Sequence, residues 1–210
     1  MRLRLTLILV GAIAVAATFT YPYWRPFFVN TIVDEPFPGL PADMQAAFLQ
    51  QLTPEQQAAF LQMADTDRDM AVAMVAAALE APSTVPDVEN PPDSSTTVSV
   101  ATASFKRIDA VHWAQGKAII YQLPDNRKIL RLEDFQAANG PDLHVLLSAS
   151  ENPTTQEEVE LGNLDFELGP LKGNIGNQNY EIPPEVDLSL YNSVVIYCQK
   201  FHVVFSTATL

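Results

Sequence analysis

The pattern of apolar and polar residues changes sharply along the chain. Residues 5–19 are predominantly apolar, whereas residues 118–123, 128–132 and 143–148 are short apolar runs separated by turn residues. Runs of this length that contain valine, isoleucine and aromatic residues are typical of β-strands. The pattern therefore predicts an apolar N-terminal helix and a β-rich C-terminal part.

Between these parts, residues 36–81 have the composition of helices. They are rich in alanine, glutamine, methionine and leucine, and no glycine follows Gly39. Residues 40–51 and 52–63 are two copies of one twelve-residue unit that share the sequence QAAFLQ. Each copy predicts a short helix with one apolar stripe. We expect these helices to pack on one another; the alternative is a methionine-rich groove for a partner helix.

Capping signals indicate where two of these helices begin. Thr53 and Gln56 form a capping box around Pro54, which occupies the first helical position. Thr66 with Asp69 offers a second start of the same kind. The segment therefore predicts a series of short helices with defined ends.

Residues 82–103 are rich in proline, serine and threonine and contain no aromatic residue. This composition predicts an extended linker and a domain boundary.

From residue 104 to 210, strand-like runs recur with turn residues between them, and only residues 187–192 predict a helical turn. Such a series predicts an antiparallel β-sandwich or barrel, of which we expect the sandwich. The predicted fold class is mainly β.

Residues 1–24 predict a membrane anchor or a signal peptide. Arg2 and Arg4 precede the apolar stretch, and aromatic residues follow it as they do at a membrane interface. In a helix, residues 5–23 rise roughly 29 Å, which just spans a hydrocarbon core of about 30 Å. We expect a single-pass anchor in the cytoplasmic membrane with the C-terminal domain on the extracytoplasmic side. Small residues near Ala16 keep cleavage and secretion open as the alternative.

The charge balance is acidic, with 12 Lys and Arg against 25 Asp and Glu and a net charge of −13. Such a surface repels nucleic acid, and we therefore expect no nucleic-acid partner. The sequence contains no glycine-rich phosphate loop, no HExxH and no GxSxG. It therefore offers no catalytic residue, and we do not expect an enzyme.

Cys198 is the only cysteine of the chain, so no disulfide can form within it. Val194 and Ile196 share its face of the predicted strand, while Val195 and Tyr197 occupy the other face. A strand that is apolar on both faces is typical of a buried strand. The thiol is then either a small buried hydrophobe or a group with a chemical role.

A copper site at Cys198 is disfavoured by spacing. His202 lies four residues further along, and in a straight strand that separation is about 13 Å, too far for two metal bonds. His144 is the second candidate histidine ligand, and we expect no metal site. Lys172 and Lys200 are candidate stabilisers of a thiolate at Cys198 if either lies near the sulfur.

Several motifs of the β-rich part occur in a specific order: GPDL before a strand, then LGPLKGN and QNYEIP, then the strand YNSVVIYC. In this order they resemble the DM-thirteen domain family, an extracellular family similar in role to DOMON domains, over residues 104–210. The resemblance implies a β-sandwich that acts in electron transfer at the cell surface, with an unknown protein or redox partner. It also implies that Cys198 is the redox-active thiol or a haem ligand. The alternative is a non-enzymatic binding or interaction module in which Cys198 only packs.

The predicted anchor can be tested by topology. If residues 5–23 span the membrane, protease added to intact spheroplasts should remove residues 25–210 while a cytoplasmic marker protein survives. Digestion only after lysis would contradict the topology. A mature N-terminus near Ala17 would contradict the anchor and leave export intact.

Overall fold

The computed structural model describes residues 37–85, 97–159 and 164–210, together with scattered residues between 6 and 21. Ten of the 19 residues of the predicted anchor, residues 5–23, are described and each of these ten is helical, whereas the other nine lie outside the described residues. None of the helices in the described ranges has the length and hydropathy needed to cross a membrane. Residues 37–210 form one unit, distinct from residues 1–36, and the description below concerns that unit.

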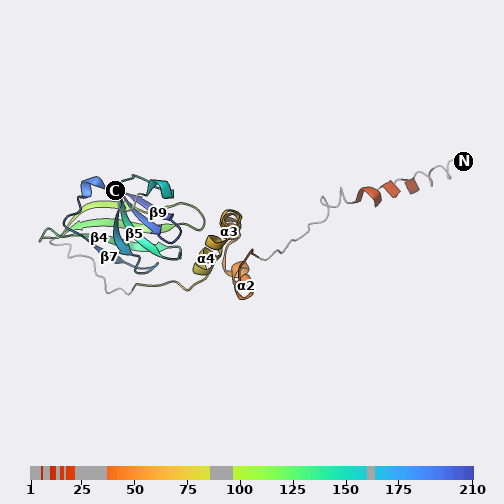
Figure 1. Cartoon of the computed structure of the whole chain (residues 1–210), viewed down its shortest axis with the longest axis horizontal. Helices are drawn as coiled ribbons and strands as arrows, with labels where there is room; N and C mark the ends of the chain where they lie inside the picture. Colours follow the sequence, from red (N-terminus) through yellow and green to blue (C-terminus); the bar gives the residue numbers. More distant parts are fainter. Residues whose placement is uncertain are drawn as a thin grey trace. The chain divides into compact units, whose positions relative to one another are not determined.

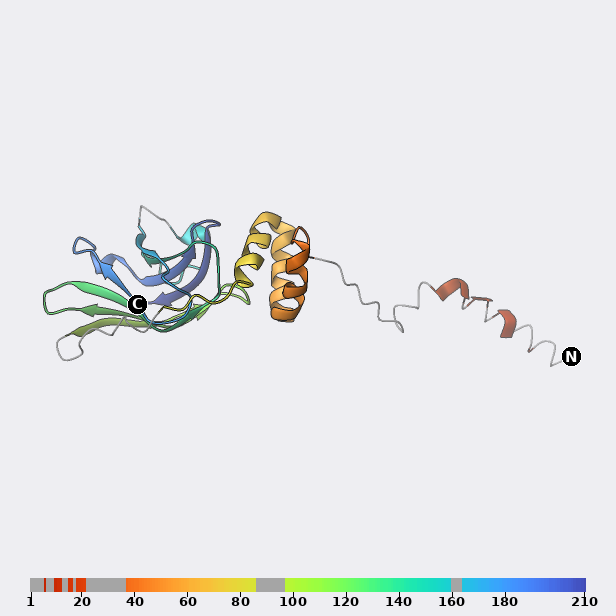
Figure 2. The same cartoon turned by 90° about the horizontal axis from the view of Figure 1, so that it is seen from below.

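The helical part of this unit contains α2 (Ala42–Gln51), α3 (Pro54–Thr66) and α4 (Arg68–Ala78). Each helix buries an apolar stripe that includes Phe48, Phe60 or Met74, respectively. These side chains belong to one hydrophobic cluster, and the helices lie side by side (Figure 2). The apolar stripes thus pack on one another, as their spacing predicts.

The capping box predicted at Thr53 is confirmed. Thr53 Oγ1 accepts a hydrogen bond from Gln56 N at 3.3 Å, and Gln56 Oε1 accepts one from Thr53 N at 3.0 Å. The start of α4 differs from the prediction, because its N-cap is Asp67, whose Oδ1 accepts from Met70 N at 2.9 Å. Helix α3 continues to Thr66, so Asp67 is the first residue with an extended backbone that can cap the next helix.

The two copies of the repeat use the same glutamine in the same way. Nε2 of Gln45 donates to the carbonyl of Leu40 at 3.0 Å, and Nε2 of Gln57 donates to that of Leu52 at 2.9 Å. Both side chains also reach carbonyls further upstream. Each glutamine thereby closes the turn that leads into its own helix and satisfies main-chain carbonyls there.

The strands are β1 (Val98–Ser104), β2 (Lys106–Arg107), β3 (Ala114–Gln122), β4 (Lys128–Ala137), β5 (Leu143–Ser148), β6 (Phe166–Pro170), β7 (Gln178–Ile182), β8 (Ser193–Cys198) and β9 (Val203–Thr209). They form a four-stranded sheet of order β1-β3-β4-β7 and a five-stranded sheet of order β2-β9-β8-β5-β6, both antiparallel (Figure 1). Two short 3-10 helices, Gln156–Glu158 and Leu188–Leu190, lie in connections. A mainly β fold of two antiparallel sheets with a few helices is confirmed.

Strand β1 begins inside the segment that its composition assigned to the linker, residues 82–103. It pairs with β3 from Val98 to Ser104. Its sequence VSVATAS alternates β-branched and small residues, and this strand propensity outweighs the high serine and threonine content. Residues 86–96 of the predicted linker lie outside the described residues.

The hydrophobic core lies between the two sheets. Its fully buried members come from both sheets and include Ile120, Leu130, Leu132, Val145, Ile196 and Phe205. Strand β8, at the centre of the five-stranded sheet, is buried along its whole length. On the opposite face of that sheet, Val195 and Tyr197 pack in a second cluster. The predicted burial of this strand on both faces is therefore confirmed.

The repeated glutamine gives a test of the helical part. Gln57→Ala removes the donor to the carbonyls of Leu52 and Phe48, and we expect the free energy of unfolding to fall by about 1 kcal/mol. Gln45→Ala should have a similar effect. Gln62 of the second copy is exposed and serves as the matched control, with an expected change within about 0.5 kcal/mol. Urea denaturation measures all three, and equal effects of Gln57→Ala and Gln62→Ala would contradict this role.

Candidate functional site around Cys198

Cys198 is the last residue of β8, and its side chain belongs to the core between the sheets. It pairs with Leu143 of β5 on one side and with Val203 of β9 on the other. The residue is 0% exposed. Because residues 199–202 form the connection to β9, the thiol lies where the sheet ends and the turn begins.

A loop between β4 and β5 closes over this end of β8. We call residues 139–142 the covering loop. The Cys198 thiol donates to the carbonyl of Pro141 with an Sγ to O distance of 2.8 Å. The amide of Gln199 donates to the carbonyl of Asp142 at 3.0 Å. Main-chain carbonyls of the loop therefore hold both the thiol and the first residue of the turn.

The covering loop can approach the core because it contains Gly140. A Cβ atom at Gly140 would lie 2.4 Å from Cζ of Phe205 and 3.0 Å from Cδ2 of Leu143. The backbone of Gly140 does not occupy the left-handed region. Close packing against the core, rather than turn geometry, therefore requires glycine in the motif NGPD.

The environment of the thiol favours its protonated form. Burial raises the pKa of Cys198, and the nearby carboxylate of Asp142 raises it further. Main-chain hydrogen bonds from Phe201 and Lys200, and the charge of Lys200, act in the opposite direction but are outweighed. The thiol is thus a sheltered hydrogen-bond donor, and it is a poor nucleophile in this state.

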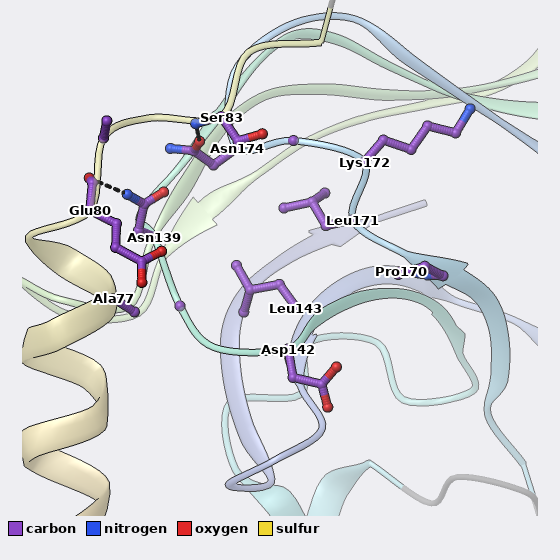
Figure 3. Close-up of a pocket in the computed structure, with 13 residues that line it drawn as sticks. Ala77, Glu80, Ser83, Asn139, Asp142, Leu143, Pro170, Leu171, Lys172 and Asn174 are labelled. Carbon is purple, nitrogen blue, oxygen red and sulfur yellow. Dashed lines mark hydrogen bonds between the residues drawn. The ribbon is translucent and has the colours of Figure 1, made fainter.

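Of the two lysines that the sequence offered as thiolate stabilisers, only Lys200 is among the groups that act on the thiol. Lys172 Nζ donates to the carbonyl of Asn179 at 2.7 Å and lies 5.2 Å from the centroid of the Tyr180 ring. Figure 3 shows the Lys172 side chain extending away from the covering loop. Sequence distance could not separate the two, because only the fold decides which lysine approaches the sulfur.

The two histidines considered with Cys198 have other partners. His144 Nδ1 lies 2.5 Å from Oε1 of Glu167, and its Nε2 lies 3.0 Å from Oδ1 of Asp142. His202 Nδ1 lies 3.3 Å from the hydroxyl of Tyr197, whose side chain is on the face of β8 opposite the thiol. The fold therefore does not gather these three side chains into one site.

His112 is buried and pairs with the exposed Asp109. Its Nδ1 lies 2.7 Å from Oδ2 of Asp109, and its ring stands edge-on to Phe205. Burial alone would raise the pKa of Asp109, but hydrogen bonds and charge from His112, with main-chain donors, lower it overall. Nε2 of His112 is buried and has no partner among the described residues. The pair fixes the turn that precedes β3.

A pocket of about 300 Å³ adjoins the covering loop (Figure 3). Its walls are the end of α4 with residues 80–83, the covering loop, and residues 170–174. Leu143 and Leu171 face each other within it, while Glu80 stands at its rim (Figure 3). Cys198 does not line this pocket, although the loop that does so also carries the carbonyl that binds the thiol.

The surroundings of Cys198 do not fit a haem. A cysteine that holds haem iron does so as a thiolate with the metal directly at its sulfur. Here the sulfur is enclosed in the core, protonated, and hydrogen-bonded to Pro141. The adjoining pocket is separated from it by the covering loop. We therefore derive no chemistry through a haem at this position.

These features define a two-sheet β domain with a single thiol sheltered at the end of its central strand. Residues 104–210 match the family model described as "Electron transfer DM13". The chain therefore belongs to the DM13 electron-transfer family, and the family predicted from the order of its motifs is confirmed. Neither a curated protein nor a solved structure matches the chain.

The raised pKa of Cys198 predicts a pH dependence of stability. The thiol ionises less readily in the folded state. Its contribution to the free energy of unfolding is therefore fully present below the pKa of the unfolded thiol and is lost as pH rises through the pKa of the folded thiol. From neutral pH to about pH 10, the wild type should lose more unfolding free energy than Cys198→Ala. Urea denaturation at matched pH values measures this difference. Parallel pH profiles of the two proteins would contradict a buried, protonated thiol.

Proposed function

We propose that the chain is a membrane-tethered electron-transfer accessory on the extracytoplasmic side, in which Cys198 is the redox-active thiol. Membership of the electron-transfer family supports the general class. The apolar pattern of residues 5–23 after Arg2 and Arg4 supports the tether and its orientation. Cys198 supports the chemistry, because it is the one residue of the chain that can form a disulfide with a partner.

The observation that carries the proposal is the way in which one short loop shelters the thiol. The covering loop is held at this end of β8 through the carbonyls of Pro141 and Asp142. Displacement of the loop breaks these two hydrogen bonds together with the contacts of Asp142 with His144 and of Asn139 with Glu80. None of these contacts belongs to the pairing of β8 with β5 and β9. Segments held by few contacts open at lower free energy than the whole domain unfolds. Local opening is therefore the route by which Cys198 meets a partner.

Opening also activates the thiol. When the sulfur reaches water, the burial that raises its pKa is removed, and a larger fraction becomes thiolate at neutral pH. The thiolate attacks one sulfur of a partner disulfide and forms a mixed disulfide with it. The other sulfur of the partner leaves as a thiolate and takes up a proton from water. One disulfide replaces another, so this step needs no further oxidant.

The second candidate function is a non-enzymatic binding module in which Cys198 only packs. Complete burial of the side chain and its raised pKa favour this alternative. The loop at residues 151–162 is the candidate binding surface of such a module; it is described up to residue 159 and contains the 3-10 helix Gln156–Glu158.

The two candidates differ in the event that exposes the sulfur. We expect wild type to react with excess aromatic disulfide at a rate that depends on urea several-fold less steeply than global unfolding does, because only the loop opens. Mass spectrometry measures the mixed disulfide, and circular dichroism measures global unfolding. Cys198→Ala is the control for reaction at other sites.

A reaction rate that shows the full urea dependence of global unfolding would contradict the redox proposal and favour packing. A Soret band in the purified chain would contradict the assignment of the thiol, rather than a haem, as the redox group.

A further inference from the structure

The residues that follow α4 are paired with the edge of the four-stranded sheet. Val85 N donates to the carbonyl of Ile175 at 2.8 Å, and Ile175 N donates to the carbonyl of Ser83 at 3.2 Å. Thr84 and Ile175 thereby form a parallel bridge. On its other side Ile175 bridges Gln136 of β4, so residues 83–85 occupy the free edge of the sheet. We call residues 83–85 the docked segment.

Two asparagine side chains fix the position of this segment. Asn174 is 8% exposed, and its Oδ1 accepts from Ser83 N at 2.6 Å while its Nδ2 donates to the carbonyl of Ala137 at 3.2 Å. Asn139 of the covering loop donates from Nδ2 to the carbonyl of Glu80 at 2.9 Å. Figure 3 shows both contacts with the chain that leaves α4. The main chain at Glu80 and Ser83 is thus held by two asparagine side chains. One belongs to the covering loop, and the other is hydrogen-bonded to Ala137 of β4.

Two glycines provide the space. A Cβ atom at Gly173 would lie 2.8 Å from both the carbonyl oxygen of Ser83 and Cγ2 of Val85, and one at Gly176 would lie 2.9 Å from the carbonyl oxygen of Val85. The backbone of Gly173 lies outside the left-handed region. All three nearest atoms to that Cβ belong to the docked segment, so the segment itself excludes a side chain there.

The side chains of the docked segment show which peptide the groove accepts. Val85 is 8% exposed, whereas Ser83 and Thr84 are exposed. Recognition therefore combines main-chain pairing over three residues with one apolar β-branched side chain at the third position. This is strand addition to a sheet edge, in which the main chain provides affinity and alternate side chains provide specificity.

We propose that Asn139, Gly173, Asn174 and Gly176 form a docking groove for an extended peptide, and that the chain's own residues 83–85 occupy it exchangeably. A segment of three residues makes too few contacts to bind tightly by itself. Its tether to α4 gives it an effective concentration in the millimolar range, and this keeps the groove filled. A free peptide of the same sequence takes its place when the segment is released. The proposal is independent of any redox role of Cys198.

Occupation of the groove also builds the pocket beside the covering loop. Residues 80–83 form one wall of that pocket, and Asn139 joins this wall to the covering loop. Release of the docked segment therefore opens the pocket on this side and removes one restraint on the loop.

Gly173→Ala in the full chain tests whether the segment depends on the groove. We expect the amides of Val85 and Ile175 to exchange hydrogen at least about tenfold faster than in the wild type, because Val85 N loses the carbonyl of Ile175 and Ile175 N loses the carbonyl of Ser83. Thr84→Ala changes an exposed side chain of the same segment and should leave the exchange unchanged. Unchanged exchange in Gly173→Ala would overturn the proposal.

Val85→Asp in the full chain tests exchange in trans. The variant should release the segment, and a fluorescent peptide of sequence EAPSTV should bind it at least about tenfold more tightly than it binds the wild type. Adding Gly173→Ala to this variant should abolish peptide binding. A folded Val85→Asp chain that takes up no peptide at millimolar concentration would overturn the proposal. If that variant does not fold, the hydrogen exchange of Gly173→Ala decides.

Discussion

Burial of β8 on both faces is the constraint on which the two-sheet part of the structure depends. The strand is central in its sheet, so Val194, Ile196 and Cys198 fill the core on one side. On the other side, Val195 and Tyr197 cluster with their sheet neighbours Leu146 and Val204, and with Val159 and the partly buried Ile108 from outside the sheet strands. At the end of the strand no neighbouring residue of β8 remains to shield the sulfur, and the covering loop takes that place. The shelter of the thiol is thus a consequence of where the strand lies.

In this arrangement, the stability of the sheet and the accessibility of the thiol depend on different contacts. The sheet pairing of Cys198 involves its main chain, whereas the accessibility of its sulfur depends on Pro141 and on the approach that Gly140 permits. In the proposed extracytoplasmic location, a thiol held in this way would be protected from oxidation without being permanently inaccessible. In the proposed function, the rate at which the loop opens limits the rate at which the thiol reacts.

Local sequence patterns predicted much of the secondary structure. Apolar runs bounded by turn residues located β5 at residues 143–148, and the two-residue period predicted that Cys198 would be buried. Capping chemistry located the start of α3 at Thr53. The start of α4 was displaced by one residue, because the choice between Thr66 and Asp67 depends on how far α3 continues.

Contacts between segments that are distant in the sequence could not be predicted from local patterns. Composition assigned residues 82–85 to a linker because they have no core of their own, but a sheet edge supplies their partners at Asn174 and Ile175. Gly173 and Gly176 lie in a glycine-rich segment between strands, and a single sequence does not show which distant segment approaches them. Likewise, nothing in the neighbourhood of Cys198 in sequence points to Pro141, 57 residues earlier, as the acceptor of its hydrogen bond.

The glutamine that recurs in the helical repeat has a consequence for how this part of the chain can vary. Each copy contains its own apolar anchor, Phe48 or Phe60, and its own amide, Gln45 or Gln57, that closes the entering turn. The hydrogen bonds of each amide lie within one copy and the residues just before it, whereas the apolar anchors pack in one shared cluster. Gain or loss of a whole copy therefore changes the length of the helical part by twelve residues and keeps each amide with its own turn, whereas an insertion between Leu52 and Gln57 would separate that amide from its carbonyl.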